Sequence, residues 1–315
     1  MIGTLDLEVF SLVSSFDCQH TLAAAVVIEG VGLHSGTKVS LRVSPASADS
    51  GISFIRSDIA SSEPILAEAT NIVSTKLCTV LGLGDYSVAT VEHLMAAFYI
   101  MNIDNAVVEL NGPEVPIMDG SAFAFLKEFR RIGLRSLNRP RSYFTVLRPF
   151  EVRLGDQFLK VEPSSSVTKM QCTINFEGSV IGKQTATYVE GAEDERLTSA
   201  RTFCHINDVN SMRQQGLARG GSLDNAIVVS DAGVINDGGL RSVDEFAQHK
   251  MLDMLGDLYL LGRPILGHVV AHKPGHTLHA AFAVKVLAAR GVLGVLRARS
   301  AGFCGVPMTQ ACALG

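Results

Sequence analysis

The sequence has no excess of charge of either sign: 27 Lys and Arg residues stand against 31 Asp and Glu residues, for a formal net charge of -4. A strongly basic balance is the usual footprint of nucleic-acid binding or of attachment to an anionic membrane surface. No apolar run reaches the roughly 18 residues that a membrane-spanning helix needs. We therefore expect no nucleic-acid partner and no membrane insertion.

Two further absences concern the compartment. Residues 1–20 contain no Lys or Arg and no continuous apolar segment, whereas a secretory signal peptide needs both. The six cysteines form no Cys-x-x-Cys pair and are scattered along the chain, which argues against a disulfide framework and against a cysteine zinc site. We expect a cytoplasmic protein whose cysteines are small buried hydrophobic residues.

The chain nevertheless has ample material for buried cores, because 47% of its 315 residues are hydrophobic. This length predicts about two domains. Alternating apolar residues indicate strands in both halves of the chain. Apolar residues at helical spacing predict helices at 91–102, 122–134, 243–262 and 277–291. Strands combined with two helices in each half predict an α+β fold made of two-layer domains.

A polar stretch with a proline at 136–142 separates the two patterned regions, and we place the domain boundary there. The expected organisation has four parts: an N-terminal extension (1–18), a first α+β domain (19–137), a second α+β domain (138–295) and a C-terminal tail (296–315). A short likeness between residues 104–108 and 224–228 is too faint to count as an internal repeat.

The segment HKMLDMLGD (249–257) carries the strongest chemical pattern. His249 and Asp253 are four residues apart, which places both side chains on one face of a helix, where they can share a cation. Lys250 and Asp257 lie in the same apolar helix, and charges in such surroundings are costly unless they are paired or bound to metal. The alternative is a surface hydrogen bond between His249 and Asp253.

A second candidate is TVEHLMAAF (90–98). With Thr90 as the helix N-cap, Glu92 and His93 lie in the first turn. The positive end of the helix dipole disfavours an imidazolium there, so His93 can bind a metal as the neutral ring. The alternative is that Glu92 only complements the dipole.

A third candidate is the turn KPGH, which presents His276 just before the last predicted helix. His268, His272 and His279 are close in sequence, and composition does not choose among them. Hydrolytic zinc sites use three protein ligands and leave one position open. Two histidines and one aspartate from two domains meet that requirement.

The segments VGLHSG, TVEHLMAA, PIMDGSA, ARTF, GGSLDNAIVV, DEFAQHKMLDMLGDL and KPGH occur in one order over about residues 19–295. Together they resemble the UDP-3-O-acyl-N-acetylglucosamine deacetylases of lipid A biosynthesis. The resemblance implies zinc-dependent hydrolysis of an N-acetyl group with release of acetate. It also implies helices sandwiched between two sheets and an active site at the domain junction.

The resemblance implies a role for each matching residue. His93, His249 and Asp253 are the expected metal ligands, with Zn²⁺ as the cofactor and Fe²⁺ as the alternative. The expected catalytic residues are Glu92 as general base, His276 as the protonated acid, Asp257 as its orienting carboxylate, and Thr202 as a hydroxyl that polarises the scissile carbonyl. Lys250 and Phe203 are expected to contact the substrate.

The same resemblance implies an acyl-chain-binding insert at about 204–222. Ile206, Val209 and Met212 recur at a spacing of three and are expected to line it; the alternative is that this face packs on the core. The chain departs from the family pattern at Cys204 and His205, and His272 and His279 are unusual beside His276.

The expected partner is a UDP-linked, acylated amino sugar, and the protein is expected to be a monomer. Two alternatives remain open: a metal-dependent hydrolase of another amide, and a metal- or nucleotide-binding protein without catalysis.

Overall fold

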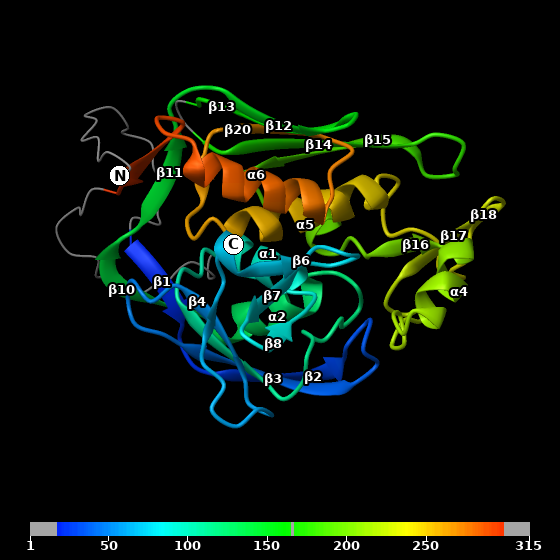
Figure 1. Ribbon diagram of the computed structural model, residues 1–315, viewed down its shortest axis with the longest axis horizontal. Coiled ribbons are helices and arrows are strands. Elements are labelled where there is room, and N and C mark those ends of the chain that lie inside the picture. The colour runs from blue at the N-terminus through cyan, green and yellow to red at the C-terminus, as the bar shows by residue number, and fades with distance from the viewer. Residues whose placement is uncertain (1–17, 165–166, 299–315) are drawn as a thin grey trace, which may run out of the picture.

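The computed structural model describes residues 18–164 and 167–298. Two five-stranded sheets form the outer layers and the main helices lie between them (Figure 1). This confirms the predicted α+β class and the sandwiched helices. Among the described residues, no helix is long and apolar enough to cross a membrane.

The first sheet has the order β2-β3-β9-β4-β5. Its strands are Val26–Val31, Lys38–Pro45, Ala106–Leu110, Ile52–Arg56 and Ile65–Leu66, in that order. Strand β9 pairs antiparallel with β3 and parallel with β4. Alternate residues of β3 and β9 are buried, as expected for strands with one face on a core.

The second sheet repeats this arrangement with the order β12-β13-β20-β14-β15. Its strands are Phe150–Leu154, Gln157–Glu162, His268–His272, Lys169–Phe176 and Gly182–Val189, in that order. Strand β20 pairs antiparallel with β13 and parallel with β14. Each sheet is thus a β-hairpin, a second antiparallel pair, and a late strand inserted between them.

The helices repeat as well. In the first half, α1 (Glu92–Ile100) precedes the inserted strand and α2 (Phe123–Ile132) follows it; in the second half, α5 (Glu245–Tyr259) and α6 (His276–Ala288) take these places. The likeness between 104–108 and 224–228 does not reflect this duplication. Residues 106–108 lie in β9, whereas residues 227–228 lie in β17, outside the second five-stranded sheet.

Helices α1 and α5 are buried on almost every face, α1 from Glu92 to Tyr99 and α5 at every position except Lys250. A helix that is apolar on all sides belongs in a core, and these two form the centre of the sandwich. Helix α2 is more amphipathic: Phe125, Leu126 and Phe129 are buried, and Phe129 stacks on Phe98 of α1 at a ring-centroid distance of 5.3 Å.

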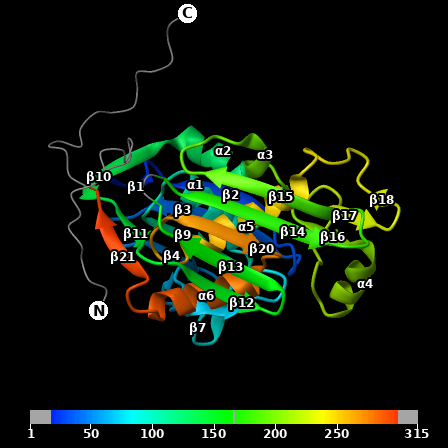
Figure 2. The same cartoon turned by 90° about the horizontal axis from the view of Figure 1, so that it is seen from above.

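The remaining strands form small sheets. Strands β6 (Ile72–Ser74), β7 (Val80–Leu83) and β8 (Tyr86–Val88) lie beside the first half. A β-α-β unit projects from the second half in Figures 1 and 2, with β18 (Gly233–Val234) at its edge. That unit consists of β16 (Phe203–His205), α4 (Ile206–Gln214) and β17 (Ile227–Ser230). A single turn, α3 (Glu195–Thr198), and a 3-10 turn at Ala69–Asn71 complete the helical set of the described residues.

The polar stretch at 136–142, where we expect the domain boundary, includes part of a strand. Leu134–Pro140 forms β10, which pairs with β1 (Cys18–Leu22). The strand has a polar sequence because it lies in a two-stranded sheet that leaves its residues largely exposed. The tail expected from residue 296 begins too early, because β21 (Leu293–Arg297) pairs with β11 (Ser142–Val146), which also pairs with β19 (Ile265–Leu266). Most of the expected extension and tail (1–17 and 299–315) lies outside the described residues.

The cysteines follow expectation only in part. Cys78 and Cys172 are buried free thiols, and Cys204 is a half-buried one. Burial raises the pKa of the Cys172 thiol to about 12, as expected for a small apolar residue rather than a metal ligand. Cys18, in contrast, is disulfide-bonded.

Candidate active site

The candidate site lies where helices α1 and α5 cross. A Cβ atom added at Gly256 would lie 1.9 Å from the backbone oxygen of Glu92 and 3.0 Å from the backbone nitrogen of Ala96. Only glycine allows so close an approach. The crossing brings the first turn of α1 against the middle of α5, where His249 and Asp253 lie one turn apart.

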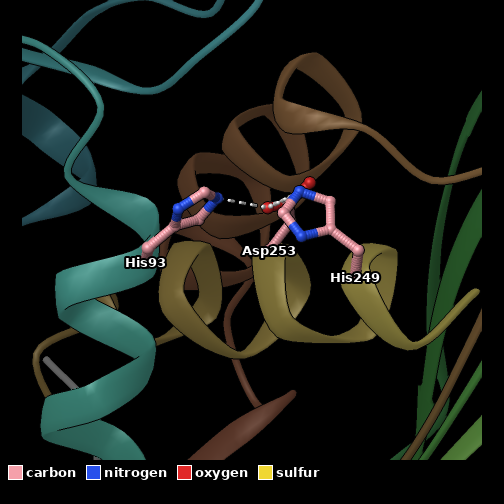
Figure 3. Close-up of side chains that lie close together, drawn as sticks. All are labelled: His93, His249 and Asp253. Atoms are coloured by element: carbon pink, nitrogen blue, oxygen red, sulfur yellow. Dashed lines mark ion pairs between the residues drawn. The ribbon is translucent and has the colours of Figure 1, made fainter. Parts of the chain in front are cut away.

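Figure 3 shows His93, His249 and Asp253 converging from these two helices. The Oδ1 atom of Asp253 lies 3.5 Å from Nε2 of His93 and 3.4 Å from Nε2 of His249. The two imidazole rings meet edge to face at 5.0 Å. All three side chains are buried. The predicted i, i+4 geometry of His249 and Asp253 is present, and their spacing with His93 is that of a possible metal site.

The donor atoms of this triad fit a divalent cation. Oδ1 of Asp253 is buried and has no hydrogen-bond partner among the described residues, which is costly for a carboxylate oxygen unless a cation neutralises it. Nδ1 of His249 lies 3.1 Å from the carbonyl oxygen of Ala200. A proton on Nδ1 leaves Nε2 unprotonated, with its lone pair available to a metal. Burial lowers the pKa of His249 to about 3, so the ring is neutral. Neutral imidazoles and a carboxylate are zinc ligands.

Lys250 and Phe203 lie on the other side of Asp253. The ammonium of Lys250 donates a hydrogen bond of 2.7 Å to Oδ2 of Asp253 and lies 5.7 Å from the ring centroid of Phe203. Burial opposes ionisation of Asp253, but its interactions with the His249 ring, the Lys250 ammonium and the His93 ring outweigh burial and hold the carboxyl pKa well below its usual range. Phe203 also packs against the His249 ring, 6.1 Å between centroids.

Glu92 lies beside the triad and is anchored by Thr79. The backbone N–H of Thr79 donates to Oε2 of Glu92 (3.0 Å), and the Thr79 hydroxyl donates to Oδ1 of Asp257 (2.6 Å). Burial raises the pKa of the Glu92 carboxyl, which suits a general base. Sequence reasoning missed Thr79, because it appeared only as one residue of a strand-like segment.

His276 connects the two carboxylates. Its Nδ1 lies 2.8 Å from Oδ2 of Asp257, and its Nε2 lies 3.9 Å from both Oε1 of Glu92 and Oδ2 of Asp253. Burial favours the neutral ring, but the charges of Asp257 and Glu92 outweigh it and raise the pKa of His276 to about 9. The ring is therefore protonated near neutral pH and can act as an acid.

The structure separates the four histidines near KPGH. His279 is buried, with Nδ1 2.7 Å from Oδ2 of Asp257. His272 lies on β20 and stacks on Phe158, and His268 lies 3.9 Å from Glu162. The sequence had not assigned a role to His279, and its spacing of three from His276 on one helix was the signal available.

Thr202 lies in the loop that also orients His249. Its backbone N–H donates to the carbonyl of Gly120, in the segment PIMDGSA, and its carbonyl accepts from Ile227. Gly120 has φ +86, and a Cβ there would lie 2.1 Å from the backbone oxygen of Asn225. This glycine lets a loop of the first half pack against the backbone of Asn225, just before β17.

The predicted N-cap at Thr90 is wrong. Helix α1 begins at Glu92, its N-cap is Val91, and Thr90 has φ +59. The Thr90 hydroxyl instead donates to Glu114 (2.9 Å), whose carboxylate also accepts from the backbone of His34 and Ser35. Glu92 and His93 nevertheless occupy the first turn, as expected. The sequence analysis assigns no role to Glu114 or to His34, although His34 lies in the segment VGLHSG.

The segment 204–222 does not form a buried helix. Helix α4 has no buried residue, and Ile206 is 40% exposed, while Val209 and Met212 are half-buried. His205, one of the two departures from the family pattern, caps this helix by accepting the N–H of Asn207 at Nδ1 (3.3 Å). Cys204 is half-buried, and burial raises the pKa of its thiol.

Comparison with known proteins adds an independent line of evidence on the family. The family of UDP-3-O-acyl N-acetylglycosamine deacetylases matches residues 19–288. A UDP-3-O-acyl-N-acetylglucosamine deacetylase of Myxococcus xanthus is 43% identical over 89% of this chain and 90% of its own length. The proteins of that name from Anaeromyxobacter sp. (strain Fw109-5) and Anaeromyxobacter dehalogenans are 42% and 44% identical, over 94% and 86% of this chain and 97% and 87% of their own lengths. On this evidence the chain belongs to the UDP-3-O-acyl N-acetylglycosamine deacetylase family.

Proposed function

We propose that this protein hydrolyses the N-acetyl group of a UDP-3-O-(3-hydroxyacyl)-N-acetylglucosamine and releases acetate, as a step of lipid A biosynthesis. The observation that carries the proposal is the convergence, in one buried site, of a His-His-Asp cluster with a separate carboxylate, Glu92, and a histidine, His276, paired with Asp257. A binding protein has no need of an acid and a base beside its metal. The relatives' names supply the substrate class.

His93, His249 and Asp253 would hold the cation, for which we propose Zn²⁺, with Fe²⁺ as the alternative. When bound, such an ion polarises a carbonyl and lowers the pKa of a bound water towards ~7. Oδ1 of Asp253 and the Nε2 atoms of His93 and His249, 3.5 and 3.4 Å from it, would supply the ligand atoms.

Glu92 and His276 divide the proton transfers. Glu92 takes a proton from the attacking water as its oxygen bonds to the carbonyl carbon of the acetamide. His276 stabilises the negative charge that develops and then donates a proton to the nitrogen as the C–N bond breaks, so that acetate and a free amine leave. Each transfer contributes about 10²–10⁴-fold to the rate. Asp257 orients His276, and its charge keeps the ring protonated.

The remaining proposed contacts fall on the second half of the chain. The Thr202 hydroxyl polarises the scissile carbonyl, and Lys250 and Phe203 contact the substrate next to the cation. Ile206, Val209 and Met212 on α4 contact the acyl chain. The exposure of α4 supports this proposal, because a helix with no buried residue keeps its apolar side chains available to a ligand.

The deciding experiment measures acetate release from the UDP-linked acylated substrate by metal-stripped protein, before and after one equivalent of Zn²⁺ is added. We expect turnover only after the addition. Folded, zinc-loaded protein that never releases acetate contradicts the proposal. Activity on amides without the UDP group or the acyl chain favours a broader metal-dependent amidohydrolase instead.

Three further proposals concern the protein as a whole. We propose a cytoplasmic location, a monomeric state, and two α+β domains divided near residue 137. Cell fractionation tests the first and sedimentation analysis the second. Limited proteolysis tests the third: two stable fragments that correspond to residues 19–137 and 138–295 are expected.

A further inference from the structure

His279 is a buried titratable group to which the proposed chemistry assigns no role. It lies on α6, three residues after His276, and its side chain is 0% exposed. Its Nδ1 is 2.7 Å from Oδ2 of Asp257, the same oxygen that lies 2.8 Å from Nδ1 of His276. Two imidazoles thus converge on one carboxylate oxygen, with their rings perpendicular at 6.3 Å.

The direction of these hydrogen bonds follows from the chemistry of the groups. An ionised carboxylate can only accept, so both histidines donate their Nδ1–H to Asp257. The Thr79 hydroxyl donates a third bond to the other oxygen, Oδ1, at 2.6 Å. Three donors from two separate segments therefore fix Asp257. Nε2 of His279 has no hydrogen-bond partner among the described residues, so Asp257 is its one polar contact there.

The orientation of His276 depends on this arrangement. His276 is the first residue of α6, and the N-cap Gly275 has no side chain to restrain it. Its Nδ1 contact with Asp257 directs its Nε2 toward Glu92 and Asp253, at 3.9 Å from each. A carboxylate that rotated would move this acid away from the reacting atoms, and small misplacements of such groups are costly.

We infer that His279 is a positioning residue for the reaction: it holds Asp257 in the one orientation that aims the Nε2 of His276 at the substrate. The inference rests on the proposed function, because His276 is the acid of that proposal. A merely structural buried histidine would fill space and stabilise the fold, but the geometry of Asp257 would not depend on its hydrogen bond.

The kinetic test compares His279→Leu, which fills the space without a donor, with His279→Asn, whose amide can still donate to Asp257. Hydrogen-bond partners that orient metal ligands typically contribute about 10–100-fold to activity, and we take the same range for a partner that orients a catalytic carboxylate. We expect His279→Leu to lower kcat by about 10-fold or more, with KM and bound zinc unchanged because the residue is fully buried. His279→Asn should recover most of kcat. His272→Leu, on β20 and outside the site, is the matched control and should retain wild-type kcat.

An NMR measurement tests the contact without activity. In zinc-loaded wild-type protein we expect strongly downfield Nδ1–H signals from both His276 and His279, beside the signal of the His249 Nδ1–H on the Ala200 carbonyl. His279→Leu should remove one of the two signals that arise from contact with Asp257. Absence of a His279 signal in the wild type overturns the inference, as does wild-type kcat in a folded His279→Leu variant. Should His279→Leu fail to fold, a wild-type spectrum without a His279 signal still overturns it. Failure of the proposed function is a separate result, namely no acetate release by zinc-loaded wild type.

Discussion

The two halves of the chain use one arrangement of strands and helices for unequal tasks. Helices α1 and α5 occupy equivalent places, as do α2 and α6. Helix α1 brings Glu92 and His93 to the site, and α5 brings His249, Lys250, Asp253 and Asp257. The central pair of helices therefore shares the proposed metal site, with one histidine from each half.

The outer helices, α2 and α6, differ more from each other than α1 and α5 do. Helix α6 begins at His276 and carries His279 one turn later, both on Asp257. Helix α2 buries only the aromatic and aliphatic residues Phe125, Leu126 and Phe129. A duplicated framework thus fixes where helices lie, while a few polar residues at the crossing decide which of them take part in chemistry.

The largest expected effect tests the equivalence of the central pair. His93→Ala and His249→Ala should each lose bound zinc and abolish acetate release, because each removes one of three ligands from opposite halves. Metal analysis of the purified variants, together with the acetate assay, checks this. If either variant retained zinc at the wild-type level, the cradle would not be shared between the halves.

Glu92→Ala should separate the role of α1 in proton transfer from its role in zinc binding. We expect zinc content to remain at the wild-type level and turnover to fall by about 10²–10⁴-fold, because a general base is removed but no ligand. Zinc content and kcat are measured on the same preparation. Loss of zinc equal to that of His93→Ala would mean that Glu92 is a ligand and not the base.

Asp257→Asn tests whether the charge of Asp257 sets the pKa of His276 at the start of α6. Burial alone would lower the pKa of His276, and the charge of Asp257 is the first of the interactions that raise it to about 9. A raised pKa keeps the acid protonated until the pH passes that value, so removal of the charge should shift the alkaline fall of kcat to lower pH. A pH–rate profile of both proteins checks the direction. An alkaline limb that stays in place would assign it to another group.

The smallest expected effect on activity belongs to α2. Phe129→Ala should lower the free energy of unfolding by about 3–5 kcal/mol, because Phe129 is fully buried against Phe98. The kcat of the folded variant should not change. Urea unfolding and the acetate assay measure the two quantities. Phe123→Ala, at a site 37% exposed on the same helix, is the control and should cost far less; a drop in kcat for Phe129→Ala would give α2 a part in the site.

Structure could be predicted from the sequence where a periodic pattern determines the local conformation. Helix α5 and its i, i+4 pair could be predicted because a helical period places His249 and Asp253 on one face whatever surrounds them. Thr79 could not be predicted, since its hydroxyl bonds Asp257 across 178 positions of sequence, and no local pattern reports such a contact.

The Thr90 error has the same origin. A threonine before an apolar helical run is a normal N-cap, but here the hydroxyl is taken by Glu114, and the backbone adopts φ +59. The strand at Leu134–Pro140 was missed because an exposed two-stranded sheet needs no apolar alternation. In each case a tertiary partner overrides a reasonable local preference.

The place of the inserted strands bears on how the chain folds during synthesis. All five strands of the first sheet lie between residues 26 and 110, and its central strand, β9, is the last to be made. Domains generally fold as units from the N-terminus while the chain emerges. The first sheet can therefore pack on α1 before α5 is synthesised. His93 would then be in place before its two proposed partner ligands, His249 and Asp253, have been added to the chain.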